Sequence, residues 1–566
     1  MATYFIDPGA ATNGTGTAAS PFKSWASVPA GAGNVYKQKR GTTWSGAFPS
    51  LTSGTAGNVT TVGAYANADG TDNPALPRPI IDIGDRIMPG TVNSPRTFMK
   101  WSEVDVRCSR VTLASDLPIM WLGSDVEISD CNLASNLTAL YGEGCSRVKL
   151  LRNKITAAMA ATNTHAMNAI VIGGAAPTGV VIDGNVITVG DGGSSLTHVV
   201  KVSCNQPIAD IQITNNRIRT ASGESTTHPN RAGIFLALAT GPEIRKLGTA
   251  AATIIIAGND VEGMVDGIFT SSVSHAWIHH NKLNRNNSFG LHATGSLANP
   301  SVGCIAEWNI CRRNGKNVSP WYGRAIELSG GGSLNALTRW VVRFNDCSYT
   351  ANWGGPMDNG TEGVGIGLDD ATSRCLVYGN LCYRNEGQAI QTYAGATPPA
   401  DTGGHQILCN YFIENGLAAI TNRRAGGTTR TPGACNVSLS GTKGALTTVA
   451  YNLFVSGYAG LREGADCSNI QKYGNVFVDQ LEYAIAAAST TGVKQNVYKP
   501  GIPINIGSLA LHANGSAKPV LLSSGVAGDV TVDPLLDVDR FMPLAGSPLL
   551  ARAVAWRSVP VQRSDA

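Results

Sequence analysis

Two acidic residues, Glu327 and Asp369, have a spacing that suits proton-transfer chemistry on a sugar. Each follows a hydrophobic residue in a short strand-like segment, GRAIELSG and GVGIGLDD. On neighbouring parallel strands, one strand spacing of about 4.8 Å and two residues of about 6.6 Å place their Cα atoms about 8 Å apart. Carboxyl groups about 6.5–9.5 Å apart can hold a water molecule for inverting glycoside hydrolysis. The pair predicts a catalytic site, in which Asp370 tunes the pKa of Asp369 by like-charge repulsion or replaces it.

Side chains that bind sugars occur at matching positions of neighbouring segments. The segments are aligned on an inward hydrophobe, which in successive segments is Leu291, Ile326, Ile366, Ile390, Ile420, Leu461 and Ile485. The residue after this hydrophobe points outward, because side chains alternate along a strand. This outward column is apolar in earlier segments, at Val171, Phe235 and Phe269, and polar between roughly residues 290 and 465. Aromatic residues, whose faces stack on sugars, precede both acidic segments. The predicted substrate-binding residues are His292, Gln391, Tyr393, Arg423, Arg462, Trp321, Tyr322 and Trp353.

Three other interpretations of this column remain open. An ordinary solvated sheet face also carries Glu, Gln and Arg, and a non-catalytic adhesin would bind a glycan without cleaving it. A polysaccharide lyase needs a base and a cation to neutralise a uronate carboxylate. Residues of suitable types are Arg423, Arg424, Arg462, His292 and Tyr393. Calcium at Asp369 and Asp370 has weak support, because two adjacent acids without further oxygen ligands make a poor site. No metal or cofactor is therefore predicted.

An Asn-x-hydrophobe repeat indicates how these segments are arranged. It recurs eleven times at intervals of 22 to 43 residues. The asparagines are Asn153, Asn185, Asn216, Asn259, Asn281, Asn309, Asn345, Asn380, Asn410, Asn452 and Asn475. The hydrophobe changes in blocks, from Ile155, Ile187 and Ile218 to Cys311, Cys347 and Cys382, and then to Phe412, Phe454 and Phe477. In a stack of β-coils about 4.8 Å apart, each inward side chain contacts the equivalent side chain of the next coil, and the loops can vary in length. The asparagines are expected to form a hydrogen-bonded ladder.

The repeat predicts an all-β chain, a single-stranded right-handed parallel β-helix with about eleven or twelve coils and capping segments. Residues 1–100 are expected to form a cap and the first irregular coils. Residues 101–492 are expected to form the regular β-helix, and residues 493–566 to close its far end. Solenoid ends need capping, because an open coil exposes apolar core and strand edges.

Composition narrows the class of protein. The 566 residues are 43% hydrophobic and only 14% charged, which excludes intrinsic disorder and a coiled coil. The sequence contains no run of 18 apolar residues, so no membrane span is predicted. A net charge of +4 without a basic tract gives no support for nucleic-acid binding. The 12 cysteines lack metal-binding spacing and are expected to be reduced core residues. The N-terminus has no basic region followed by an apolar stretch, so no secretion signal is predicted.

The repeats resemble those of right-handed β-helix polysaccharide lyases, hydrolases and bacteriophage tailspike depolymerases, in the pectate-lyase-like superfamily. The opening YFIDPGAATNGTGTAASPFKSW and the following NVYKQKRGTTWSG resemble the first strand and cap of such proteins. The ending VDPLLDVDRFMPLAGSPLL resembles their usual terminal segment.

The resemblance implies a tailspike depolymerase that recognises and cleaves a capsule, exopolysaccharide or O-antigen. The carboxylate pair, and not the resemblance, favours hydrolysis over β-elimination. The resemblance also implies a homotrimer, other phage tail proteins as partners, and a virion protein made in the host cytoplasm and released by lysis. The alternative location is that of a secreted bacterial lyase that has lost its signal.

Overall fold

The structure is a computed structural model that describes most of the chain. The residues outside the description are 85–94, 109–118, 136–137, 158–167, 175–176, 191–197, 204–205, 223–231, 316–322, 332–334, 352–362, 395–400, 418–434, 479, 481–482, 488–492, 495, 499–504, 507–529 and 532–566. The chain divides into two compact units. Unit 1 is Met1–Thr270 with His275–Trp277, and unit 2 is Ser271–Ser274 with Ile278–Ala566.

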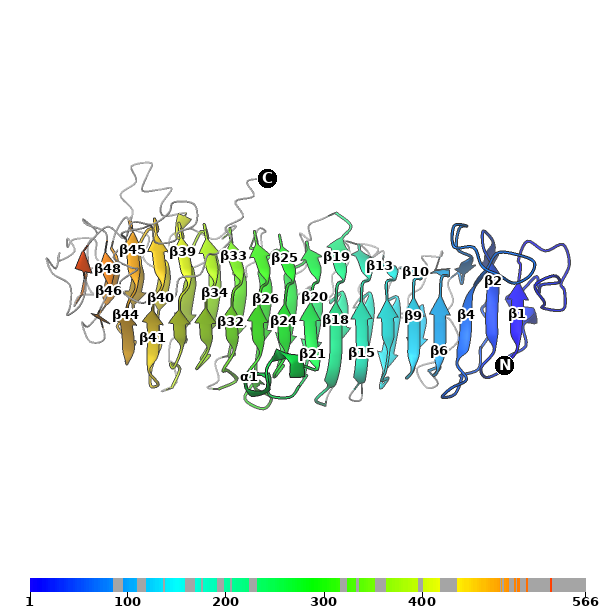
Figure 1. Ribbon diagram of the computed structural model, residues 1–566, viewed down its shortest axis with the longest axis horizontal. Coiled ribbons are helices and arrows are strands. Elements are labelled where there is room, and N and C mark those ends of the chain that lie inside the picture. Colours follow the sequence, from blue (N-terminus) through cyan, green and yellow to red (C-terminus); the bar gives the residue numbers. More distant parts are fainter. Residues whose placement is uncertain are drawn as a thin grey trace. The chain divides into compact units, whose positions relative to one another are not determined.

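The coils of unit 1 supply strands to three parallel sheets, which we call A, B and C, and the first coils contribute to sheets A and B (Figure 1). Sheet A contains β1 (Thr3–Ile6), β2 (Val35–Lys39), β4 (Thr60–Tyr65), β6 (Met99–Ser102), β9 (Val126–Ser129), β12 (Lys149–Leu151), β15 (Thr178–Asp183), β18 (Ala209–Thr214) and β21 (Ile254–Ala257). Sheet B contains β3 (Thr43–Ser45), β5 (Ile80–Asp82), β7 (Asp105–Arg107), β10 (Asn132–Ser135), β13 (Lys154–Ala157), β16 (Val186–Val189), β19 (Arg217–Thr220) and β22 (Asp260–Glu262). Sheet C contains β8 (Met120–Leu122), β11 (Leu140–Glu143), β14 (Ile170–Gly173), β17 (Val200–Val202) and β20 (Ala232–Ala237). The short helices of the unit are η1 (Trp25–Ser27), α1 (Ile244–Leu247) and η2 (Thr249–Ala251).

Unit 2 repeats the same three-sheet arrangement. Its sheet A contains β28 (Ile305–Glu307), β32 (Val341–Arg343), β35 (Leu376–Tyr378), β38 (Gln406–Leu408), β41 (Thr447–Ala450), β44 (Ile470–Tyr473) and β47 (Val493–Lys494). Its sheet B contains β25 (Lys282–Asn284), β29 (Ile310–Arg312), β33 (Asp346–Ser348), β36 (Leu381–Tyr383), β39 (Tyr411–Ile413), β42 (Leu453–Val455), β45 (Val476–Val478), β48 (Val497–Tyr498) and β50 (Val530–Thr531). Its sheet C contains β26 (Phe289–Thr294), β30 (Arg324–Ser329), β34 (Val364–Asp369), β37 (Ile390–Tyr393), β40 (Val437–Leu439), β43 (Leu461–Glu463), β46 (Ile485–Ala487) and β49 (Asn505–Ile506).

Four further strands complete the description. They are β23 (Asp266–Ser271) and β24 (Trp277–His279), which lie at the division between the units, and the paired β27 (Ser301–Val302) and β31 (Leu337–Thr338). The predicted all-β, right-handed parallel β-helix is confirmed, because three parallel sheets wind through each unit with almost no helix.

The predicted asparagine ladder is present in both units. In unit 1, Asn153 Nδ2 donates to Asn185 Oδ1 at 3.0 Å, and the same bond links Asn185 to Asn216 at 2.9 Å. In unit 2 an equivalent row runs from Asn281 to Asn496. Each side chain also bonds a backbone carbonyl, as Asn380 does to Val342 O at 2.9 Å. The ladder therefore satisfies buried backbone groups at the turns after sheet A in the coils that carry these asparagines.

The predicted stacking of like residues in the core is also confirmed. Cys311, Cys347 and Cys382 are paired in register on neighbouring strands of sheet B, and Phe412 continues the column. All four are fully buried. Eleven cysteines lie in the described part of the chain, none in a disulfide, and eight of them are buried. The cysteines therefore serve there as small hydrophobic core residues.

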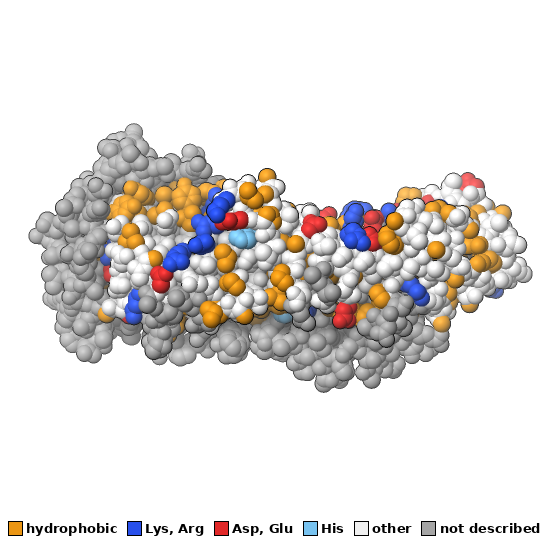
Figure 2. All heavy atoms as spheres, turned by 90° about the horizontal axis from the view of Figure 1, so that it is seen from below, with side chains coloured by type: hydrophobic (Ala, Val, Ile, Leu, Met, Phe, Trp, Pro, Cys, Tyr) orange, Lys and Arg blue, Asp and Glu red, His pale blue; other side chains and the backbone are white. Residues whose placement is uncertain are grey.

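Charged side chains are few on the face shown in Figure 2, and basic and acidic groups lie together there. Ion pairs between neighbouring basic and acidic side chains include Arg147 with Asp125, whose Nε and Oδ1 atoms are 2.6 Å apart. No helix in the described part of the chain is long and apolar enough to cross a membrane.

Candidate functional site

The candidate site lies on sheet C of unit 2, where neighbouring strands are paired in register. Glu327 on β30 is paired with His292 on β26 and with Gly367 on β34. Two residues further along, Ser329 is paired with Asp369. Glu327 and Asp369 therefore lie on adjacent strands with an offset of two residues, as the sequence predicts. Gln391 and Tyr393 on β37 continue the two columns.

One prediction of register was wrong. The segment around Ile420 was expected to follow β37 in this sheet, but Ile390 is paired with Val437, and Val437 with Leu461. Ser438 thus occupies the outward position between Gln391 and Arg462. The asparagine ladder explains the choice, because Asn415 Nδ2 donates to Asn436 Oδ1 at 2.9 Å, just before β40.

A buried arginine joins the two acidic residues. Arg324 Nη1, at the beginning of β30, donates to both Glu327 Oε2 and Asp369 Oδ2. The exposed fractions are 3% for Arg324, 5% for Glu327 and 6% for Asp369. We call these three residues the acidic triad. Arg324 was not among the predicted site residues, although it stands three positions before Glu327 in the segment GRAIELSG.

The shared nitrogen limits the separation of the carboxylates. Two oxygens that accept from one nitrogen, each at up to about 3 Å, lie at most about 6 Å apart. This is closer to the spacing of about 5–5.5 Å in retaining glycosidases than to the wider spacing of inverting ones. The carboxyl groups therefore approach each other more closely than the Cα positions alone indicate, and a retaining geometry is open to them.

Gly367 makes room for the acidic triad. It lies opposite Glu327, and a Cβ atom at this position would overlap Glu327 Oε2 and Arg324 Nη1. The ion pairs therefore lie directly over the Gly367 backbone. Any larger residue would displace them.

Burial makes both carboxyl groups of the triad weak acids. It raises the pKa of Glu327 well above its usual value, the charge of Asp369 raises it further, and Arg324 opposes both effects. The pKa of Asp369 is also raised by burial, and Arg324 lowers it. Because the two groups interact strongly, they titrate as a pair that holds a proton more readily than isolated carboxyls. Such a pair can contain one proton donor and one carboxylate.

Asp370 lies beside the acidic triad but outside its ion pairs. Its Oδ2 accepts from Ser329 Oγ at 2.8 Å, and its N–H donates to Tyr393 O at 2.6 Å. Its charge raises the pKa of Asp369 and of Glu327, as the sequence suggested. Asp370 and Ala371 have φ angles of 49° and 67°, a left-handed conformation that costs free energy for residues other than glycine. Strain is thus concentrated directly after Asp369.

Two buried acceptor atoms face this region without a donor among the described residues. They are Asp369 Oδ1 and Gln391 Oε1. A buried acceptor without a donor costs about 1–3 kcal/mol. Both atoms are enclosed by protein, so a ligand reaches them only if the covering side chains move.

The other predicted site residues lie at different distances from the triad. His292 is on the strand adjacent to Glu327 and packs on Phe289, with ring centroids 4.5 Å apart. Tyr393 is 42% exposed and is available for contact with a sugar ring. Arg462 is two strands beyond Gln391. The positions that lie outside the described residues are Trp321, Tyr322, Trp353, Arg423 and Arg424.

The corresponding outward column in unit 1 is mainly apolar. Val171 is flanked in register by Tyr141 and Lys201, and Phe235 follows Lys201. The second outward column of unit 1 also contains a carboxylate, Glu143 on β11, but this residue is exposed, whereas Glu327 and Asp369 in unit 2 are buried.

Among the described residues, no group of three or more His, Cys, Asp or Glu could hold a metal ion. Asp369 Oδ2 instead contacts the cationic Arg324.

Comparisons with known proteins give remote structural likenesses. No protein-family model and no curated protein matches the sequence. Among solved structures, a GH136 lacto-N-biosidase from Eubacterium ramulus is 11% identical, with 85% of this chain and 68% of that chain covered and a TM-score of 0.27. The Dettilon tailspike protein is 12% identical, with 80% and 63% covered and a TM-score of 0.28. A rhamnogalacturonan lyase is 13% identical, with 80% and 87% covered and a TM-score of 0.23. With identities of 11–13% and TM-scores of 0.23–0.28, these likenesses are remote.

Proposed function

We propose that this chain is a polysaccharide-cleaving glycoside hydrolase in which Glu327 and Asp369 are the catalytic residues. The observation that carries the proposal is the acidic triad, in which one arginine holds two buried carboxyl groups with raised pKa values on adjacent strands. A purely structural role would explain the ion pairs of Arg324 with the two carboxylates. It would not explain why Asp369 Oδ1 and Gln391 Oε1 are buried without a hydrogen-bond donor.

The geometry supports a retaining mechanism. Glu327, whose pKa is raised more strongly, donates its proton to the glycosidic oxygen as the bond to the anomeric carbon breaks. Asp369 Oδ1, which is not engaged by Arg324, attacks that carbon and forms a glycosyl ester. Glu327, now ionised, then removes a proton from a water molecule that displaces Asp369 and restores the starting state.

Other residues of sheet C serve substrate binding in this proposal. Gln391 accepts a hydrogen bond from a sugar hydroxyl, and the exposed ring of Tyr393 stacks against a sugar face. Arg324 positions both carboxyl groups and does not react.

The substrate class in this proposal is a bacterial surface polysaccharide, and the protein is a phage tailspike. The resemblance of the repeats to tailspike depolymerases supports this part. Such a protein is expected to be a homotrimer attached to other tail proteins. Multi-angle light scattering should give three times the chain mass of 58.9 kDa. A monomeric mass would contradict the trimer without affecting the proposed chemistry.

The direct test is a screen of the purified protein on bacterial capsules and lipopolysaccharides, with mass analysis of the products. On a cleaved glycan, Glu327→Gln and Asp369→Asn should each lower turnover by at least about 10²-fold, the usual contribution of a proton-transfer residue. Glu414→Gln is the matched control, because Glu414 forms an ion pair with Arg384 in a turn of sheet B. Products with an unsaturated uronate end would indicate a lyase. Binding without any product would indicate an adhesin.

A further inference from the structure

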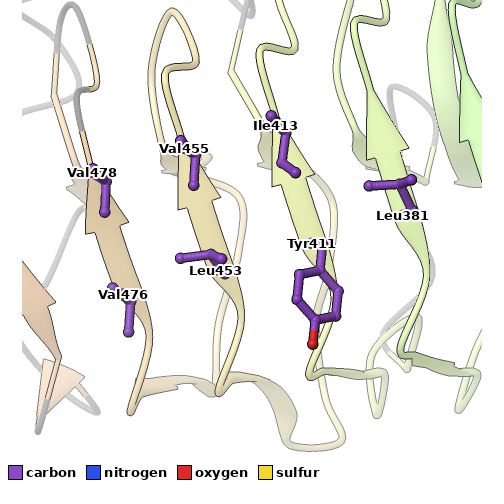
Figure 3. Close-up of a cluster of buried hydrophobic side chains, with 7 residues drawn as sticks. All are labelled: Leu381, Tyr411, Ile413, Leu453, Val455, Val476 and Val478. Carbon is purple, nitrogen blue, oxygen red and sulfur yellow. The ribbon is translucent and has the colours of Figure 1, made fainter. Parts of the chain in front are cut away.

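The outer face of sheet B in unit 2 is apolar on four neighbouring strands. In β36, β39, β42 and β45 the middle residues are Cys382, Phe412, Phe454 and Phe477, which fill the interior column. Because side chains alternate along a strand, the residues on either side of them point to the opposite, outer face. Figure 3 shows the outward hydrophobic residues, which are Leu381, Tyr411, Ile413, Leu453, Val455, Val476 and Val478. We call them the outer apolar face.

This face is covered. Leu453 and Val476 are fully buried, and Val478, the most exposed of the seven, retains 9% of its surface. The partly buried hydrophobic residue packed against the cluster is Tyr383, which belongs to the same face. The outer side of a solenoid otherwise meets water, so the cover must come from beyond the described coils.

We propose that residues 532–566, the C-terminal segment of this same chain, bind along the outer apolar face. The described chain ends on this sheet, because β48 is paired with β45, and β50 with β48. Thirty-five residues follow Thr531. An extended chain of this length reaches about 115 Å, whereas four strands span only about 15 Å. The segment therefore begins next to the face and is long enough to cross it several times.

The composition of the segment fits an apolar surface. Thirteen of its 35 residues are large and hydrophobic, and its four acidic and four basic residues leave no net charge to desolvate. The hydrophobic residues are Val532, Leu535, Leu536, Val538, Phe541, Met542, Leu544, Leu549, Leu550, Val554, Trp556, Val559 and Val561.

Other parts of the chain fit the face less well. Residues 418–434 contain one large hydrophobic residue, Ile420, and three arginines. Residues 499–529 connect β48 to β50 and are tied at both ends to the last coils. The C-terminal segment is the remaining long apolar stretch.

Limited proteolysis of the full-length protein tests this inference. The segment contains trypsin sites at Arg540, Arg552 and Arg557, which should be protected when it is bound. Leu453→Asp, at the centre of the face, should release the segment and speed cleavage at these sites at least tenfold, as followed by mass spectrometry. Val455→Ser, at the margin of the face where the side chain is 8% exposed, should give a smaller increase in the rate of cleavage. This variant provides the test if Leu453→Asp does not fold.

The control is Thr448→Asp, which places the same charge on the outer side of sheet A and should leave cleavage unchanged. Rapid cleavage of the wild-type segment while the coils stay intact would overturn the inference. So would a wild-type oligomer that Leu453→Asp dissociates without changing cleavage, because a second copy would then be the occupant.

Discussion

At the scale of single residues, Arg324 controls the ionisation of both carboxyl groups. Its positive charge lowers the pKa of Glu327 and of Asp369 against the effect of burial. Arg324→Lys keeps the charge but cannot reproduce the contacts of one planar guanidinium with two carboxylates. The pKa of Asp369 should therefore rise, and the acidic limb of the activity profile should move to higher pH. A profile with an unchanged acidic limb but a lower maximum would assign Arg324 a purely structural role.

Gly367 provides a second test at this scale. Gly367→Ala should push Glu327 and Arg324 away from the sheet, because the added Cβ overlaps both. A displacement of about 1 Å can cost about 10²-fold in rate, so turnover should fall by about that factor. Gly63→Ala on β4 is the control, since its Cβ would meet Ser102 Oγ at an ordinary 3.6 Å. Full activity of Gly367→Ala would place the reacting groups elsewhere.

The residue scale also shows what the sequence could and could not predict. Side-chain alternation around Ile326 and Leu368 was enough to place Glu327 and Asp369 on one face. By the same rule, the side chain of Arg324 would point to the same side of the strand as that of Ile326, which faces the core. A long side chain at the first residue of a strand can depart from that alternation. Its contacts could only be found from the three-dimensional structure.

At the scale of strands, β43 and β44 carry an ion pair within the core of unit 2. Lys472 and Glu463 are 1% and 6% exposed and contact each other through Nζ and Oε2. Lys472→Met should destabilise the protein by about 3–5 kcal/mol, because Glu463 is left buried and unpaired. The double variant with Glu463→Leu should recover most of this loss in urea unfolding. Equal losses in the single and double variants would mean that packing, and not the unpaired charge, sets the cost.

The segments that follow β37 along the chain show why register was harder to predict than fold. The segments AAITNRRA and CNVSLSG both contain the short apolar pattern of a strand in this sheet. What distinguishes them is Asn436, which continues a second ladder from Asn415. The first ladder begins at Asn153, because the preceding coil has Cys131 at the corresponding position. The N–H of Cys131 donates to Asn153 Oδ1 at 3.0 Å. Coils without the asparagine marker were therefore less visible in the sequence.

At the scale of the whole molecule, stability should depend on pH through His405. Burial lowers its pKa to about 4 from an ordinary 6.5, so the folded protein keeps this histidine neutral. Between these values the unfolded chain binds a proton that the folded chain does not. The stabilisation is therefore complete above about pH 6.5, and it is lost as pH falls towards 4, by up to about 3 kcal/mol.

The measurement is the thermal midpoint of the wild type and of His405→Gln as a function of pH. Their difference should shrink as pH falls from 6.5 to 4, because the variant lacks the titrating group. A difference that stays constant would show that His405 is already protonated in the folded protein or does not titrate in this range.

The asparagine ladder gives each unit a direction. In every rung the amide N–H group of one coil points to the amide oxygen of the coil that follows it in the sequence. During synthesis, a coil that is already formed thus presents an unfilled donor towards the chain still to come. Each new coil needs only its predecessor as a template, and the aligned amide dipoles strengthen one another as the row grows. The ladder is therefore suited to vectorial growth, in which the protein assembles in the order in which a ribosome delivers it.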